Sequence, residues 1–110
     1  MEEKIRALHE SLYSMIVGFL YYQSRKNIEE IKQVIPQVQE FVLWFLEGNQ
    51  FGIEEELYQD MSMNLMQILQ DIVTAMDQGD HVLLHDAVAY GLMDYVELFV
   101  PQEDQKNDDL

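Results

Sequence analysis

The sequence of 110 residues contains no cysteine and few basic side chains. Without thiols it has no disulfide, no thiolate metal ligand and no cysteine nucleophile. A chain of this length suits a single domain that builds its core without cross-links. Six Lys and Arg stand against 21 Asp and Glu, for a net charge of −15. Nucleic acids and anionic membrane surfaces both require clustered Lys and Arg, so we expect neither as a partner.

Long hydrophobic runs are also missing. The longest apolar run extends from Met15 to Tyr22 and is interrupted by Gly18. This is well short of the roughly 20 residues that a membrane span needs. The first residues, Met1 to Lys4, are acidic where a signal peptide is basic. We therefore expect a cytoplasmic protein that does not insert into membranes.

The acidic side chains are unevenly distributed. Residues 1–48 contain seven acidic and five basic side chains, whereas residues 49–110 contain fourteen acidic side chains and Lys106 alone. The two halves therefore carry charges of about −2 and −13, and the second half produces most of the negative field.

Apolar side chains recur every three or four residues in four segments, which is typical of amphipathic helices. The segments cover about residues 2–23, 28–47, 54–78 and 80–100. Asn27 and Asp80 are predicted N-caps, and Gly79 is a predicted helix end. Pro36 lies inside the second segment and predicts a kink or a restart there. Ala87 and Gly91, four residues apart, form a stripe of small side chains that would let a neighbouring helix come close.

Four helices with short connections predict an all-α, antiparallel four-helix bundle over residues 1–101. We expect the polar residues 102–110 to form a disordered acidic tail. The predicted core consists of one stripe for each helix: Ile5, Leu8, Leu12, Met15, Ile16 and Phe19; Ile28, Ile31, Ile35, Val38, Val42 and Phe45; Leu57, Met61, Leu65, Ile68, Ile72, Ala75 and Met76; Leu84, Val88, Leu92, Tyr95 and Phe99.

Some apolar side chains do not fit these stripes. The run from Phe41 to Leu46 covers every direction around its helix, and Trp44 falls in line with the polar Glu40 and Glu47. A second extra stripe lies on the first helix. Exposed aromatic clusters are typical of interfaces, although the same side chains could pack inside a wide bundle. The predicted interface residues are Tyr13, Val17, Tyr21, Leu43 and Trp44.

Two histidines are the best candidates for chemistry. His81 and His85 are four residues apart near a helix start, a spacing at which both could contact one metal ion. Exposed histidines at a polar helix start are the simpler interpretation. The chain has one further histidine, His9, and no nucleophile, phosphate-loop or paired-carboxylate motif. We expect no cofactor and no catalytic residue.

The stretch Ile68 to Tyr95 contains the pattern Ile-Leu-x-Asp-Ile-Val followed by Gly-Asp-x-Val-Leu-Leu-x-Asp. This pattern resembles one in small helical proteins of Gram-positive bacteria. The resemblance covers about a quarter of the chain, implies a helical bundle and implies no particular activity. In size, acidity and helix number the chain is also similar to flagellar export chaperones, without any residue motif of that family.

These observations favour a non-enzymatic, cytoplasmic protein-interaction module. The leading prediction is a homodimer formed through the first two helices, with the acidic second half facing outward. One alternative is a chaperone or antidote-type protein that binds a basic or amphipathic helix. The other alternative is a metal-dependent enzyme that uses His81 and His85.

Overall fold

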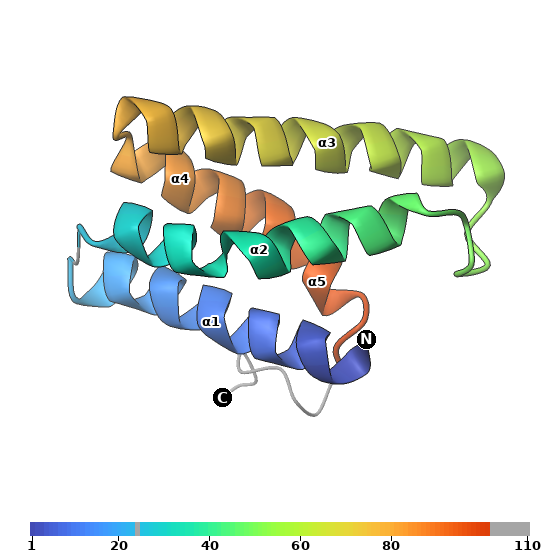
Figure 1. Cartoon of the computed structure of the whole chain (residues 1–110), viewed down its shortest axis with the longest axis horizontal. Coiled ribbons are helices and arrows are strands. Elements are labelled where there is room, and N and C mark those ends of the chain that lie inside the picture. The colour runs from blue at the N-terminus through green and yellow to red at the C-terminus, as the bar shows by residue number, and fades with distance from the viewer. Residues whose placement is uncertain (24, 102–110) are drawn as a thin grey trace.

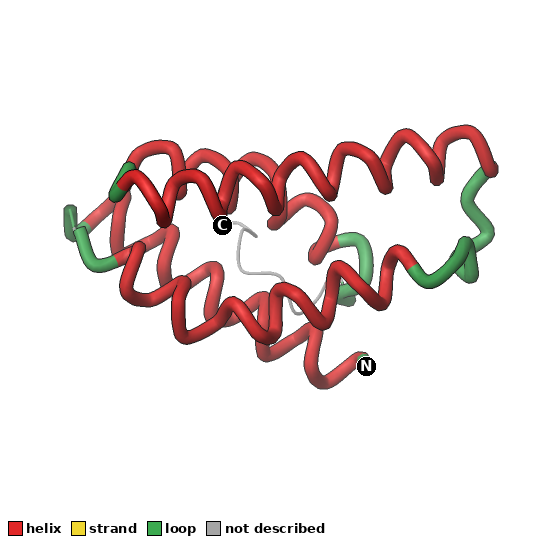
Figure 2. Tube along the Cα trace, turned by 45° about the horizontal axis from the view of Figure 1, so that its top comes forward, coloured by secondary structure: helices red, strands yellow, loops and turns green. Residues whose placement is uncertain are grey.

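The computed structural model describes residues 1–23 and 25–101, and every regular element in these ranges is helical. The elements are α1 (Glu2–Tyr21), α2 (Asn27–Leu46), α3 (Glu55–Gln78), α4 (His81–Ala87), the π-helical turn η1 (Val88–Leu92) and α5 (Met93–Glu97). Figure 2 shows short loops joining them. The all-α bundle of four helical segments is therefore confirmed, with α4, η1 and α5 together forming the fourth. Residues 102–110, the predicted disordered tail, lie outside the described residues.

Successive segments run back and forth across the molecule. In Figure 1, α1 runs from right to left, α2 returns to the right, α3 goes back to the left, and α4 to α5 lead to the right again. The fourth segment crosses behind α2: α4 packs mainly on α3, while α5 contacts α1. The outer faces of α1, α2 and α3 are therefore only partly covered by other helices.

Local chemistry explains where the helices begin and end. The side chain of Asp80 accepts a hydrogen bond from the backbone N–H of Leu83 at 3.0 Å, as an N-cap does. Gly79 ends α3 in the left-handed conformation with φ of 67°, which favours glycine. Glu55 and Glu56 occupy the first turn of α3, where the helix dipole favours carboxylates.

The N-cap prediction for Asn27 is wrong. Asn27 is the first residue of α2, is 2% exposed, and has no capping bond. Its amide Nδ2 donates to the backbone oxygen of His81, and its Oδ1 lies 2.9 Å from His81 Nδ1. Buried amide groups are almost always hydrogen-bonded, and the partners of this one are groups of His81 at the start of α4. Asn27 therefore joins the two helical hairpins at one end of the bundle.

Helix α2 is assigned as one unbroken helix through Pro36, so it does not restart there. A bend at Pro36 stays a prediction. The fourth segment differs from the single α-helix that its sequence predicts, because η1 inserts a wider turn. At Gly91 in this turn, a Cβ would lie 3.1 Å from the Cδ1 of Ile68. The prediction that small residues allow a close helix approach is confirmed at Gly91, where α3 packs against the bare backbone.

The core follows the predicted stripes closely. The least exposed large side chains include the stripe residues Leu8, Leu12, Ile31, Phe45, Leu65, Ile72, Leu84 and Leu92. Phe41 is equally buried, although the predicted stripe of α2 does not include it. Leu57 is an exception, because it is exposed and the neighbouring Tyr58 is buried instead. The Tyr58 hydroxyl donates to the backbone oxygen of Phe45 at 2.6 Å, which satisfies its polar atom inside the core. No helix in the described part of the chain is long and apolar enough to cross a membrane.

Candidate interaction faces

The outer side of α1 carries an exposed aromatic surface, here called the tyrosine face (Tyr13, Val17, Leu20, Tyr21 and Tyr22). Tyr21 and Tyr22 are 74% and 78% exposed. Beside them is an open groove of about 590 Å³, lined by Glu10, Tyr13, Ser14, Val17, Gly18, Tyr22 and Glu30. Three of the predicted interface residues, Tyr13, Val17 and Tyr21, therefore lie on one continuous face.

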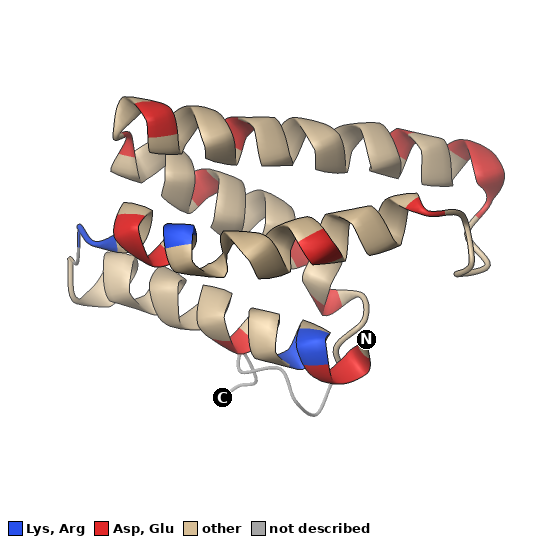
Figure 3. Ribbon diagram, in the orientation of Figure 1, with Lys and Arg blue, Asp and Glu red and all other residues tan. Residues whose placement is uncertain are grey.

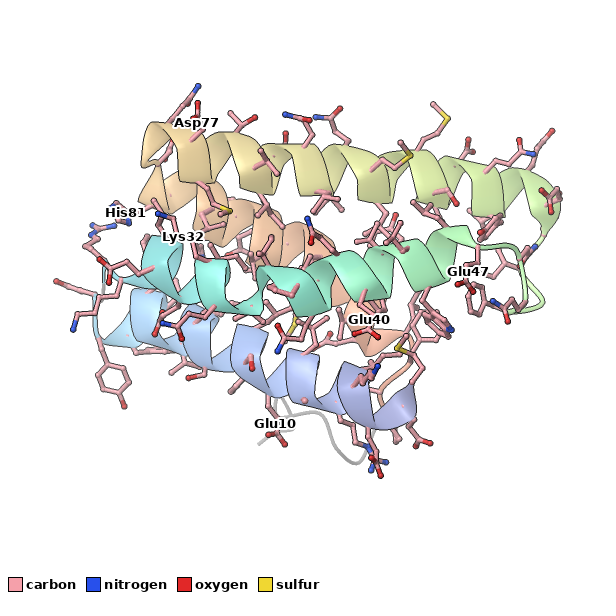
Figure 4. The ribbon with its side chains drawn as sticks, viewed as in Figure 1. Glu10, Lys32, Glu40, Glu47, Asp77 and His81 are labelled. Atoms are coloured by element: carbon pink, nitrogen blue, oxygen red, sulfur yellow. The ribbon has the colours of Figure 1, made fainter. Side chains whose placement is uncertain are left out.

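The charges on the tyrosine face are of both signs. Glu10 and Glu30 line the groove, and in Figure 4 Glu10 points away from α2. Arg6, one helical turn before Glu10, forms an ion pair with Glu2 at 3.4 Å, and Lys26 precedes Glu30 by four residues. This face is therefore less negative than the second hairpin, which has no Lys or Arg among the described residues.

A second exposed apolar surface lies between α2 and α3. This α2/α3 groove has a volume of about 590 Å³ and is lined by Gln39, Val42, Leu43, Leu46, Met66, Leu69, Gln70 and Val73. Leu43 is 66% exposed and Met66 is 57% exposed. Leu43 lies on the side of α2 roughly opposite to Glu30, because Glu30 precedes it by thirteen residues, or about three and a half turns. The structure thus separates Leu43 from the tyrosine face.

Trp44 is not on the open face that its helical register predicts. It is partly buried in an aromatic cluster at the α2 end of the bundle, with ring centroids 5.1 Å from Phe51 and 5.0 Å from Phe99. Phe51 comes from the loop after α2, and Phe99 follows α5. Both rings lie outside α2, Phe51 seven residues and Phe99 55 residues after Trp44, so helical periodicity alone could not place them over Trp44.

The two candidate metal ligands lie in different surroundings. His85 is buried, and its ring stacks on Phe19 with centroids 4.6 Å apart. His81 is partly exposed, and its Nδ1 lies within hydrogen-bond distance of Asn27 Oδ1. Within residues 1–23 and 25–101, no group of three or more His, Asp or Glu side chains is arranged to hold a metal ion. The structure therefore adds no further ligand to the pair.

His9, the third histidine, is buried in α1 and its Nε2 lies 3.2 Å from Glu97 Oε2 on α5. This contact ties the first helix to the last. The sequence gives a partial signal for it, because His9 lies between the core residues Leu8 and Leu12. The partner could not be found from the sequence, since it is 88 residues away.

A third groove, narrower and more polar, lies between α3 and the fourth segment. Its volume is about 280 Å³, and its lining includes the carboxylates Asp71, Asp86 and Asp94 together with the exposed Tyr90. Sequence reasoning missed this grouping, because the three residues come from two helical segments. Three of the carboxylates of the second hairpin thus line one groove.

No protein-family model matches this chain, and comparisons with curated proteins and with solved structures also give no match. The resemblance to small helical proteins of Gram-positive bacteria therefore stays a prediction. Functional inference rests on the exposed faces themselves.

Proposed function

We propose that this protein is a non-enzymatic protein-interaction module that acts in the cytoplasm as a homodimer formed through the tyrosine face. The observation that supports this proposal is the exposure of Tyr21 and Tyr22 beside the groove that Tyr13 and Val17 line. Aromatic side chains bury a large area at low cost in conformational entropy, which is why they are enriched at interfaces.

Charge favours this face for contact between two copies. Each chain carries a net charge of −15, so two copies repel each other over most of their surface. The tyrosine face has Arg6 and Lys26 beside its carboxylates, whereas the second hairpin has no Lys or Arg among the described residues, so two copies repel each other less at this face. A two-fold axis through this face would pair the same surface on both subunits and direct both acidic second hairpins outward.

The test is the mass of the protein in solution. We expect sedimentation at micromolar concentration to give twice the 13.0 kDa chain mass. Tyr21→Glu should weaken the dimer by roughly tenfold or more, because it places a carboxylate in the buried contact on both subunits. Circular dichroism should show an unchanged fold, since Tyr21 is exposed.

Tyr90→Glu is the matched control, because Tyr90 is 71% exposed but lines the groove between α3 and the fourth segment, not the groove of the tyrosine face. This variant should stay dimeric. A monomeric wild-type protein at the highest soluble concentration would contradict the proposal. An equal loss of dimer in both tyrosine variants would also contradict it, since the effect would then be due to added charge alone.

The metal-dependent alternative is tested separately. Titration with Zn²⁺ should show no tight binding to the wild-type protein, because two histidines without a third ligand hold zinc weakly. Tight binding lost in His85→Ala would revive the enzymatic interpretation.

A further inference from the structure

The α2/α3 groove is unused by the proposed dimer. Its walls are the apolar side chains of two helices that run in opposite directions (Figure 1). Its two polar residues, Gln39 and Gln70, are uncharged. Leu43 and Met66 expose more than half of their surface into solvent. Such a surface favours an occupant that buries apolar side chains along the groove.

Carboxylates lie just beyond each end of the groove. Glu47 follows Leu43 by four residues and Asp77 follows Val73 by four, so each lies one turn further along the same helix face. Both are exposed, and Figure 4 shows them at opposite ends of the α2 and α3 pair.

Two further charged side chains lie near the groove. Glu40, on the adjoining side of α2, forms an ion pair with Lys4 at 2.6 Å. Lys32 lies seven residues, or about two turns, before Gln39 on the same face of α2, and Figure 4 shows it at the same end of the helix pair as Asp77. The groove is thus apolar along its length, with Glu47 beyond one end and both Asp77 and Lys32 beyond the other, so the charges at its ends sum to −1.

Two possible occupants from this chain itself fit poorly. Residues 102–110 contain four acidic side chains, one lysine and a single apolar residue, Leu110, so their sequence has neither the charge nor the apolar stripe that the groove would bind. A second copy placed groove to groove would bring its own Glu47 and Asp77 against the same carboxylates. Like charges across an interface disfavour that arrangement.

We propose that the α2/α3 groove docks an amphipathic helix of a partner protein, with Lys or Arg side chains at both ends of its apolar stripe. The α2 wall extends from Gln39 to Leu46, or about 10 Å, which accommodates about two turns of a bound helix. The helix would present apolar residues at positions i, i+3 or i+4, and i+7 to the groove. Its terminal cations would pair with Glu47 and Asp77. This site is independent of the tyrosine face and of dimer formation.

The probe is a fluorescent peptide of roughly 15 residues with a leucine stripe and lysines at both ends, long enough to form a helix on binding. A second peptide keeps the stripe and replaces the lysines with glutamates. Fluorescence anisotropy against the full-length protein should show saturable binding of the lysine peptide. Binding of the glutamate peptide should be at least roughly tenfold weaker, because its charges repel the groove ends.

Variants of the protein locate the site. The double variant Leu43→Lys, Val73→Lys should abolish binding of the lysine peptide, since it places cations inside the groove. Leu57→Lys, on the opposite side of α3 and also exposed, is the control for added charge and should bind within about threefold of the wild type.

The charges at the groove ends are tested with two double variants that remove the same number of carboxylates from different places. Glu47→Gln, Asp77→Asn should weaken binding roughly fivefold, as expected for two exposed ion pairs. Glu10→Gln, Glu30→Gln removes the same charge from the tyrosine face and should leave binding unchanged. Equal binding of both peptides, or binding that survives the double lysine variant, would overturn the proposal. Loss of the wild-type dimer in the double lysine variant would overturn it too, because the groove would then hold a second copy.

Discussion

The two helical hairpins of this protein differ sharply in charge. Among the described residues, every Lys and Arg lies in α1, in α2 or between them, whereas the second hairpin presents only carboxylates (Figure 3). The first hairpin also carries the neighbouring exposed Tyr21 and Tyr22, whereas the second carries Tyr90. A nearly neutral, aromatic surface suits contact with a like-charged copy, and an acidic surface suits contact with a cationic partner. The difference indicates that one small bundle can keep two kinds of interaction apart.

The hairpins are held together at both ends by a few buried contacts. At one end, Asn27 of α2 bonds to His81 of α4. Towards the other, Phe45 of α2 has ring contacts with Tyr58 of α3 and Tyr95 of α5. These contacts join a near-neutral half to an acidic half, and they are where the pairing of the hairpins can be broken.

The largest effect is expected at Phe45, which is fully buried. Phe45→Ala should lower the free energy of unfolding by about 3–5 kcal/mol, because it removes a ring that packs against both hairpins. Urea denaturation measures this loss. Leu43→Ala, two residues away but exposed, should change stability by less than about 0.5 kcal/mol. Similar losses in the two variants would mean that Phe45 does not join the hairpins.

A smaller effect is expected at the opposite end of the bundle. Asn27→Ala should cost about 1–3 kcal/mol, since it removes a buried amide that bonds to the backbone oxygen and to Nδ1 of His81. The exposed Gln39→Ala in the same helix is the control and should be nearly neutral in the same denaturation experiment. If both variants match the wild type, the bond to His81 contributes nothing to stability.

The smallest effect concerns the charges of the first hairpin. Lys4 and Glu40 form an exposed ion pair between α1 and α2. Lys4→Gln should cost about 0.2–1 kcal/mol at low salt and nearly nothing at 1 M salt, where exposed pairs are screened. Lys32→Gln, which breaks no ion pair among the described residues, should show no comparable loss. A salt-independent loss in Lys4→Gln would show that packing, not charge, is responsible.

Helical periodicity and cap chemistry predicted most of the fold. The core stripes, the end of α3 at Gly79 and the cap at Asp80 follow from residues close together in the sequence. The π-helical turn could not be predicted, because it accompanies the packing of Gly91 on Ile68 from another helix. Asn27 satisfies the local pattern of an N-cap, but its side-chain amide donates instead to the backbone oxygen of His81, which is distant in the sequence.

The interaction faces were predictable only in part. Tyr13, Val17 and Tyr21 share a face because they follow one another at four-residue spacing in one helix. Leu43 and Trp44 are neighbours in the sequence, yet Leu43 lies in an open groove, whereas Trp44 is covered by Phe51 of the next loop and by the distant Phe99. Which of two apolar neighbours is covered depends on long-range packing, and the sequence carries no local signal for it.

The central claim is that two copies meet through the tyrosine face and leave the α2/α3 groove open. Because the chain lacks cysteine, single-cysteine variants report one position each. Ser14→Cys, exposed on the tyrosine face, and Leu43→Cys, exposed in the groove, can be treated with a short bis-maleimide and weighed by mass spectrometry. We predict a covalent dimer for Ser14→Cys and single chains for Leu43→Cys. Cross-linking of Leu43→Cys without cross-linking of Ser14→Cys would contradict the account.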